Sequence, residues 1–110
     1  MSDLIAEVDK LREQYRELAA AHSQLLTQQN ECTTELTILD DDAKIYKSTG
    51  AVLTTQSKAD AISTITKRIE YINAEIESKS KLMSSLKSNI EEKSKKLEAI
   101  SAQMRAAQNN

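Results

Sequence analysis

Residues 62–76 read ISTITKRIEYINAEI and place an isoleucine at alternating spacings of three and four residues. This spacing gathers apolar side chains on one narrow stripe of a helix, which is the pattern of a coiled coil. The same seam continues toward the C-terminus as the a and d positions of a heptad repeat: Ile62, Ile65, Ile69, Ile72, Ile76, Lys79, Met83, Leu86, Ile90, Lys93, Leu97, Ile100, Met104 and Ala107. The second half of the chain is therefore predicted to be a long coiled-coil helix over residues 58–108.

The first half of the chain carries an equivalent heptad seam. Its positions are Leu4, Val8, Leu11, Tyr15, Leu18, His22, Leu25, Gln29, Cys32, Leu36 and Leu39. A seam sustained over this length predicts a coiled-coil helix over residues 1–43. Three carboxylates, Asp40 to Asp42, would face the negative end of the helix dipole, so we expect the helix to end near them.

Residues 44–57 differ sharply from both halves in composition. Ile, Tyr, Val and repeated Thr favour a pleated strand, and the single glycine of the chain, Gly50, can adopt the positive φ that a turn needs. A β-hairpin turning at Thr49-Gly50 would pair Tyr46 with Leu53 on one face. The predicted fold class is thus mainly α, an antiparallel two-helix coiled coil joined by one β-hairpin, in a single domain over residues 1–110.

Folding back at this bend defines which seam residues face each other. Residues whose numbers add to about 101 should be opposite, which pairs Leu39 with Ile62 and Leu4 with Leu97. The same register brings Val8 near Lys93 and His22 near Lys79. These lysines can cover the seam with their stems while the ammonium groups reach water.

The two ends of the predicted hairpin suggest two kinds of contact. An isolated two-stranded hairpin is marginal in water and exposes unpaired edges, so neighbouring subunits should complete it into an intersubunit β-barrel. The expected oligomerisation residues are Ile45, Tyr46, Val52 and Leu53. Apolar residues near the two termini have no cap, and they are either the frayed end of the seam or a site for other proteins. The candidate protein-binding residues are Leu4, Ile5, Val8, Leu97, Ile100 and Met104.

Composition excludes several functional classes. With one His, one Cys and no glycine-rich phosphate loop, no catalytic, metal or cofactor site is expected, and the chain is not predicted to be an enzyme. His22 is read as a polar layer of the seam and Cys32 as a small buried group. The net charge of -2, with mixed signs, gives no reason to expect nucleic acid, and no apolar run could span a membrane. A cytoplasmic location fits best.

Several short motifs in the sequence resemble those of a known family. They are Asp41-Asp42-Ala43, Lys44-Ile45-Tyr46-Lys47, Gly50-Ala51-Val52-Leu53 and the run from Thr66 to Ile76. Together they resemble the β-class subunits of prefoldin, closest to the eukaryotic subunit-six type. One departure is Ala51, where that type usually has proline, which leaves the turn type at Thr49-Gly50 open.

The resemblance implies an ATP-independent co-chaperone. Prefoldin is a hexamer of α- and β-class subunits whose hairpins form the barrel and whose coiled-coil tips bind unfolded clients such as actin and tubulin. It passes these clients to the cytosolic group II chaperonin. The alternative interpretation is a structural coiled-coil tether or spacer that binds one folded partner.

Overall fold

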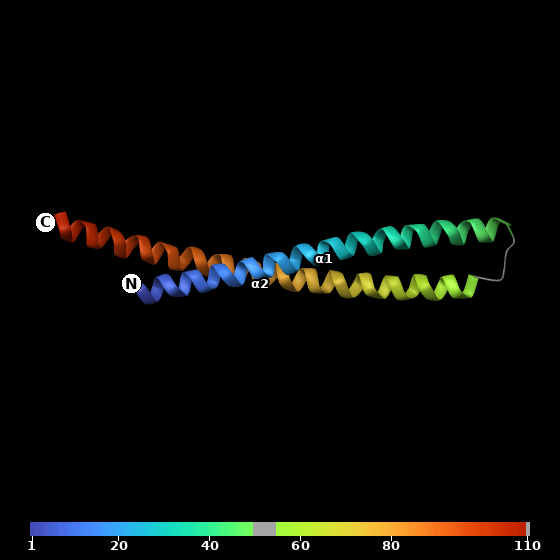
Figure 1. Ribbon diagram of the computed structural model, residues 1–110, viewed down its shortest axis with the longest axis horizontal. Helices are drawn as coiled ribbons and strands as arrows, with labels where there is room; N and C mark the ends of the chain where they lie inside the picture. Colours follow the sequence, from blue (N-terminus) through green and yellow to red (C-terminus); the bar gives the residue numbers. More distant parts are fainter. Residues whose placement is uncertain (50–54, 110) are drawn as a thin grey trace. The chain divides into compact units, whose positions relative to one another are not determined.

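The chain forms two long helices in a computed structural model that describes residues 1–49 and 55–109, and the side chains of residues 1–42 and 58–108. Helix α1 spans Ser2–Thr49 and helix α2 spans Thr55–Asn109 (Figure 1). Two compact units divide them: unit 1 is Met1–His22 with Lys79–Asn110, and unit 2 is Ser23–Ser78. Within each unit a segment of α1 lies antiparallel to a segment of α2. The prediction of a mainly α, antiparallel two-helix coiled coil is confirmed.

Local hydrogen bonds satisfy polar groups within the two helices. The backbone amide of Ile5 donates to the Met1 carbonyl at 3.1 Å, and Asp3 places a carboxylate in the first turn, where the helix dipole is positive. Threonine hydroxyls donate to the carbonyl four residues earlier, in Thr27, Thr33, Thr34, Thr37, Thr64 and Thr66. Each of these hydroxyl groups therefore has a hydrogen-bond partner within its own helix.

The most deeply buried cluster lies in unit 2. Cys32, Ile65 and Ile72 are buried and form the core, and the half-buried residues packed against it are Leu25, Leu36, Leu39, Ile69 and Ile76. Each of these side chains occupies a predicted seam position. The heptad pattern therefore identified the core of this unit as far as its side chains are described, and the interpretation of Cys32 as a small buried group is confirmed.

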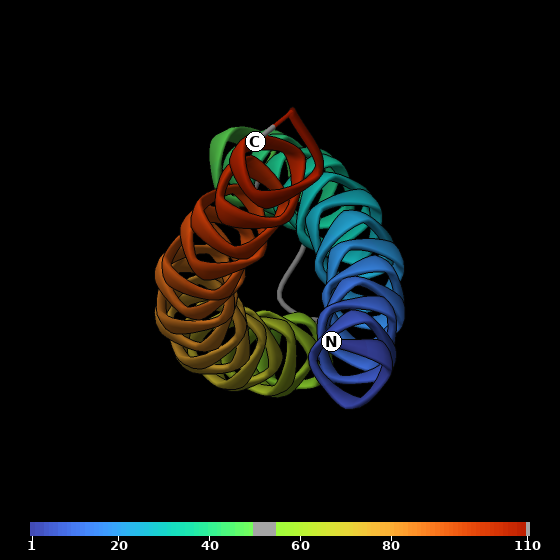
Figure 2. The same cartoon turned by 90° about the vertical axis from the view of Figure 1, so that its left-hand side faces the viewer.

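Unit 1 is packed more loosely. Val8, at 2% exposure, is the one buried apolar side chain among its described residues. The other seam residues are half-buried from Leu4 to His22 in α1 and from Lys79 to Ile100 in α2. The seam then stops, because Met104 and Ala107 are exposed. Figure 2 shows the start of α1 and the end of α2, which both belong to this unit, toward the viewer.

The region expected to form a β-hairpin differs from the prediction. Residues 44–49 complete α1 and residues 55–57 begin α2, so strands are absent from residues 1–49 and 55–109. In the single chain, α1 therefore runs past the expected end near Asp40, and α2 begins before the expected start near Lys58. In a single chain, helical residues satisfy their backbone groups locally, whereas two strands would lack a third. The proposed turn at Gly50 lies outside the described residues.

Candidate functional site

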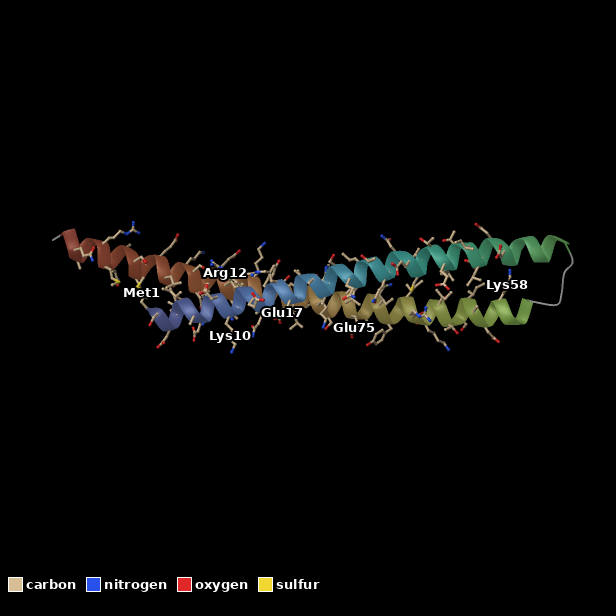
Figure 3. The ribbon with its side chains drawn as sticks, viewed as in Figure 1. Met1, Lys10, Arg12, Glu17, Lys58 and Glu75 are labelled. Carbon is tan, nitrogen blue, oxygen red and sulfur yellow. The ribbon has the colours of Figure 1, made fainter. Side chains whose placement is uncertain are left out.

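Three contacts between the helices fix their register. In unit 2, Lys58 Nζ lies 3.4 Å from Asp42 Oδ2, and the Gln29 side-chain amide donates to Asn73 Oδ1. In unit 1, Lys93 Nζ lies 2.9 Å from Glu7 Oε2. The residue numbers of these pairs add to 100, 102 and 100. The predicted register is therefore confirmed, and Figure 3 shows Lys58 pointing from α2 toward α1.

Lys93 illustrates how a charged residue is accommodated in the seam. Its side chain is 25% exposed, so the stem covers the seam while the ammonium reaches Glu7 at the edge. Glu7 directly precedes Val8, the buried residue that the sequence places near Lys93. The ion pair thus lies beside the best-packed point of unit 1.

The predicted protein-binding residues near the termini differ in accessibility. Ile5 is 43% exposed and Met104 is 51% exposed, so both present apolar surface to other molecules. Leu4, Leu97 and Ile100 are half-buried. Val8 is buried, so this residue would be reached only if the two helices separated locally. We call the five accessible or half-buried residues of this set, namely Leu4, Ile5, Leu97, Ile100 and Met104, the tip cluster.

Several exposed apolar side chains were not singled out from the sequence. They are Met1, Leu26, Ile38, Tyr71 and Leu82. All except Met1 lie outside the a and d positions of the predicted seam. Their signal in the sequence is an apolar residue outside the a and d positions, because such a residue has no partner helix to cover it.

Shallow hollows occur between the helix segments of unit 1. One of about 300 Å³ is lined by Glu7, Lys10, Leu11, Gln14, Asn89 and Lys93. Another of about 250 Å³ is lined by Tyr15, His22, Ser80, Met83, Ser84 and Lys87. These hollows occur where polar residues interrupt the seam, and they account for the loose packing of this unit. His22 thus lines a partly filled layer, in keeping with its interpretation as a polar position of the coiled coil.

The predicted oligomerisation residues fall in the bend. Ile45 and Tyr46 lie on the last turns of α1, but their side chains are outside the described part of the structure. Val52 and Leu53 also lie outside the described residues. The role of this set in assembly stays a prediction.

The described residues also bear on metal sites and on membrane-spanning segments. No group of three or more His, Cys, Asp or Glu side chains among them is arranged to hold a metal ion. Neither helix, as far as the structure describes it, has a stretch apolar enough to pass through a lipid bilayer.

Comparison with known proteins places the chain in a family. The model of the family described as "Prefoldin subunit" matches residues 2–108. A probable prefoldin subunit 6 of Plasmodium falciparum is 28% identical over 108 residues, which cover 96% of this chain and 91% of the relative. Prefoldin subunit 6 of Saccharomyces cerevisiae is 34% identical, with 69% of each chain covered.

A probable prefoldin subunit 6 of Dictyostelium discoideum is 46% identical over a shorter match, which covers 53% of this chain and 44% of the relative. No solved structure matches the chain significantly. The family match extends over both helices and the bend between them, and subunit 6 recurs among the relatives. This chain therefore belongs to the prefoldin subunit family, a family of non-enzymatic co-chaperone components, and is of the subunit-six type.

Proposed function

We propose that this chain is one subunit of a prefoldin-type hexamer, an ATP-independent co-chaperone of the cytoplasm. The complex binds non-native proteins at the ends of its helical arms and passes them to a group II chaperonin. The observation that carries this proposal is the family match over residues 2–108. The accessible apolar residues of the tip cluster support it, because they lie at the end of unit 1 where a client would be held.

Assembly is proposed to occur through residues 44–57. In the single chain these residues extend the two helices where the structure describes them, because a lone hairpin is too weak to compete. In the complex, residues 44–57 would form the hairpin, and strands of neighbouring α- and β-class subunits would pair with the edges of the hairpin and bury Tyr46 and Leu53. The backbone hydrogen bonds lost from the helix ends would then be replaced between subunits.

Client binding is proposed to use the tip cluster. Contact between apolar surfaces is non-directional, so one cluster can accept many unrelated sequences. The flexible side chain of Met104 suits such varied contacts. Opening of unit 1 would add Val8, and its loose packing lowers the free energy required for that opening. Clients that are rich in exposed apolar segments, such as newly made actin and tubulin, fit this surface.

A second candidate function is a tether that binds one folded partner. Its support is the exposure of Ile38 and Tyr71, two large side chains of unit 2 far along the sequence from the tip cluster. A folded partner would use a fixed surface of this kind, whereas clients in many conformations would not.

The breadth of client binding separates the two functions. We expect the complex that contains this chain to suppress the aggregation of several unrelated denatured proteins, whereas a tether would protect none or only its own partner. Tyr46→Asp and Leu53→Asp should each prevent assembly, because the new carboxylate would be buried in the shared sheet. Tyr71→Asp is the matched control, since this tyrosine is exposed. Assembly that survives both bend substitutions would contradict the proposed role of residues 44–57.

A further inference from the structure

The apolar seam of unit 2 does not by itself select one register between the helices. In the observed register Cys32 lies at the level of Ile69. Sliding one helix by a heptad would set it at the level of Ile62 or Ile76, which are again isoleucines. The shift toward Ile76 would also set Leu36 opposite Ile72, so it restores apolar contacts, whereas the reverse shift would set Leu36 opposite Lys58.

The polar contacts between the helices behave differently. After a one-heptad shift, Gln29 would lie at the level of Thr66 or Ser80, whose hydroxyl side chains are shorter than that of Asn73 and reach less far toward Gln29. Glu7 would lose Lys93 and instead face Leu86 or Ile100. The polar pairs therefore distinguish registers that the apolar residues leave nearly equivalent.

The pair Gln29–Asn73 is the uncharged one of these contacts. Gln29 occupies a seam position and is half-buried, whereas its partner Asn73, which directly follows the buried Ile72, is exposed. The carboxylates of the two ion pairs are 58% and 50% exposed, so water and salt weaken those pairs. A polar residue at a single a position is a known means of fixing the register of a coiled coil at some cost in stability.

We infer that the hydrogen bond from Gln29 to Asn73 is a register lock that holds α1 and α2 in one alignment. The lock has a consequence for assembly that rests on the proposed function. A one-heptad shift would move the midpoint of the bend by half a heptad, so Tyr46 and Leu53 would no longer lie symmetrically about it. The lock thus positions the residues that neighbouring subunits are proposed to contact.

Cross-linking to the native Cys32 tests the register directly in the full chain. Ile69→Cys places a thiol at the level of Cys32, whereas Ile62→Cys and Ile76→Cys place one about 10 Å away along the helix, beyond the reach of a disulfide. Without further changes, oxidation should cross-link the first variant and leave the other two largely reduced. Adding Gln29→Leu should raise the cross-linking of Ile76→Cys roughly tenfold, because the amide no longer disfavours that register. Ile62→Cys should stay largely reduced, because its register sets Leu36 opposite Lys58.

Two further variants make the result decisive. Asn73→Ala removes the acceptor from the other helix and should also raise the Ile76→Cys cross-link. Gln28→Leu, the same change at the exposed neighbouring position, should leave that cross-link at its starting level. Helix content should be retained in Gln29→Leu, since leucine suits the seam.

An Ile76→Cys cross-link that stays at the starting level in both Gln29→Leu and Asn73→Ala would overturn the lock. Loss of helix content in Gln29→Leu would overturn it as well, because the contact would then support folding and not alignment. Assembly of the unmodified chain with other subunits is measured separately. Its failure would count against the proposed function and leave the cross-linking result standing.

Discussion

Removing the exposed apolar side chains of the tip cluster should weaken client capture by an amount that the structure bounds. Ile5 is 43% exposed and Met104 is 51% exposed, so about half of each side chain remains to be covered by a client. Full burial of a side chain of this size contributes about 1.5–3 kcal/mol, and half of that is about 0.7–1.5 kcal/mol for each residue. The double variant Ile5→Ser with Met104→Ser should therefore bind an unfolded client roughly 10- to 100-fold more weakly.

The assay should report this arm alone, because other subunits also hold clients in the proposed complex. A photoreactive group at the exposed Ala107 of this chain would label a denatured client bound at its tip. The yield of labelled client, measured against client concentration, gives the apparent affinity of this arm. Leu82→Ser is the matched control, since Leu82 is 49% exposed but lies far from the tip cluster along α2.

Stability should be nearly unchanged in the double variant, because substitutions of exposed side chains usually alter the free energy of unfolding by less than about 0.5 kcal/mol each. An apparent affinity equal to that of the unmodified chain would refute the assignment of client binding to the tip cluster. An equal loss in Leu82→Ser would do the same, since it would show contact along the whole arm.

Three further predictions concern packing. Ile72→Ala should lower the free energy of unfolding, measured in urea, by about 2–5 kcal/mol, because it leaves a cavity in the core. The neighbouring Tyr71 is 67% exposed, so Tyr71→Ala should lower it by less than about 0.5 kcal/mol. Similar losses in the two variants would contradict the assigned core. Lys93→Leu should raise the melting temperature, because an apolar seam residue replaces a partly hydrated ion pair with Glu7. A lower melting temperature would show that the ion pair contributes more to stability than the apolar contact that replaces it. Cys32 should react slowly with a thiol reagent until urea unfolds the chain, and rapid reaction of the folded chain would contradict its burial.

The sequence predicted the seam and the register well, because the seam follows from periodicity and the register from the predicted position of the bend. Alternating spacings of three and four residues place Ile65 and Ile72 on the buried stripe, and the position of the bend then determines which residues meet. The contact between Glu7 and Lys93 lies where that register puts it. Even the accommodation of Lys93 in the seam follows from the length of its side chain.

Other features could not be predicted from periodicity, because they depend on whether helix or strand is the more stable and on how far the two helices pack together. Residues 44–49 favour strands by composition, yet in the single chain they extend α1, because helical hydrogen bonds need no partner strand. Accessibility among the predicted protein-binding residues was also not predictable from the heptad positions. Val8 and Met104 both occupy a positions, but Val8 is buried and Met104 is exposed. The difference arises from how far the packed part of unit 1 extends, which depends on both helices together.

The mass of the intact complex, measured after gentle purification from cells through a tag on this chain, tests the central claim most directly. We expect a single assembly of six chains in which this chain is combined with other prefoldin subunits. Recovery of the chain alone, or only as a pair of identical chains, would contradict the account.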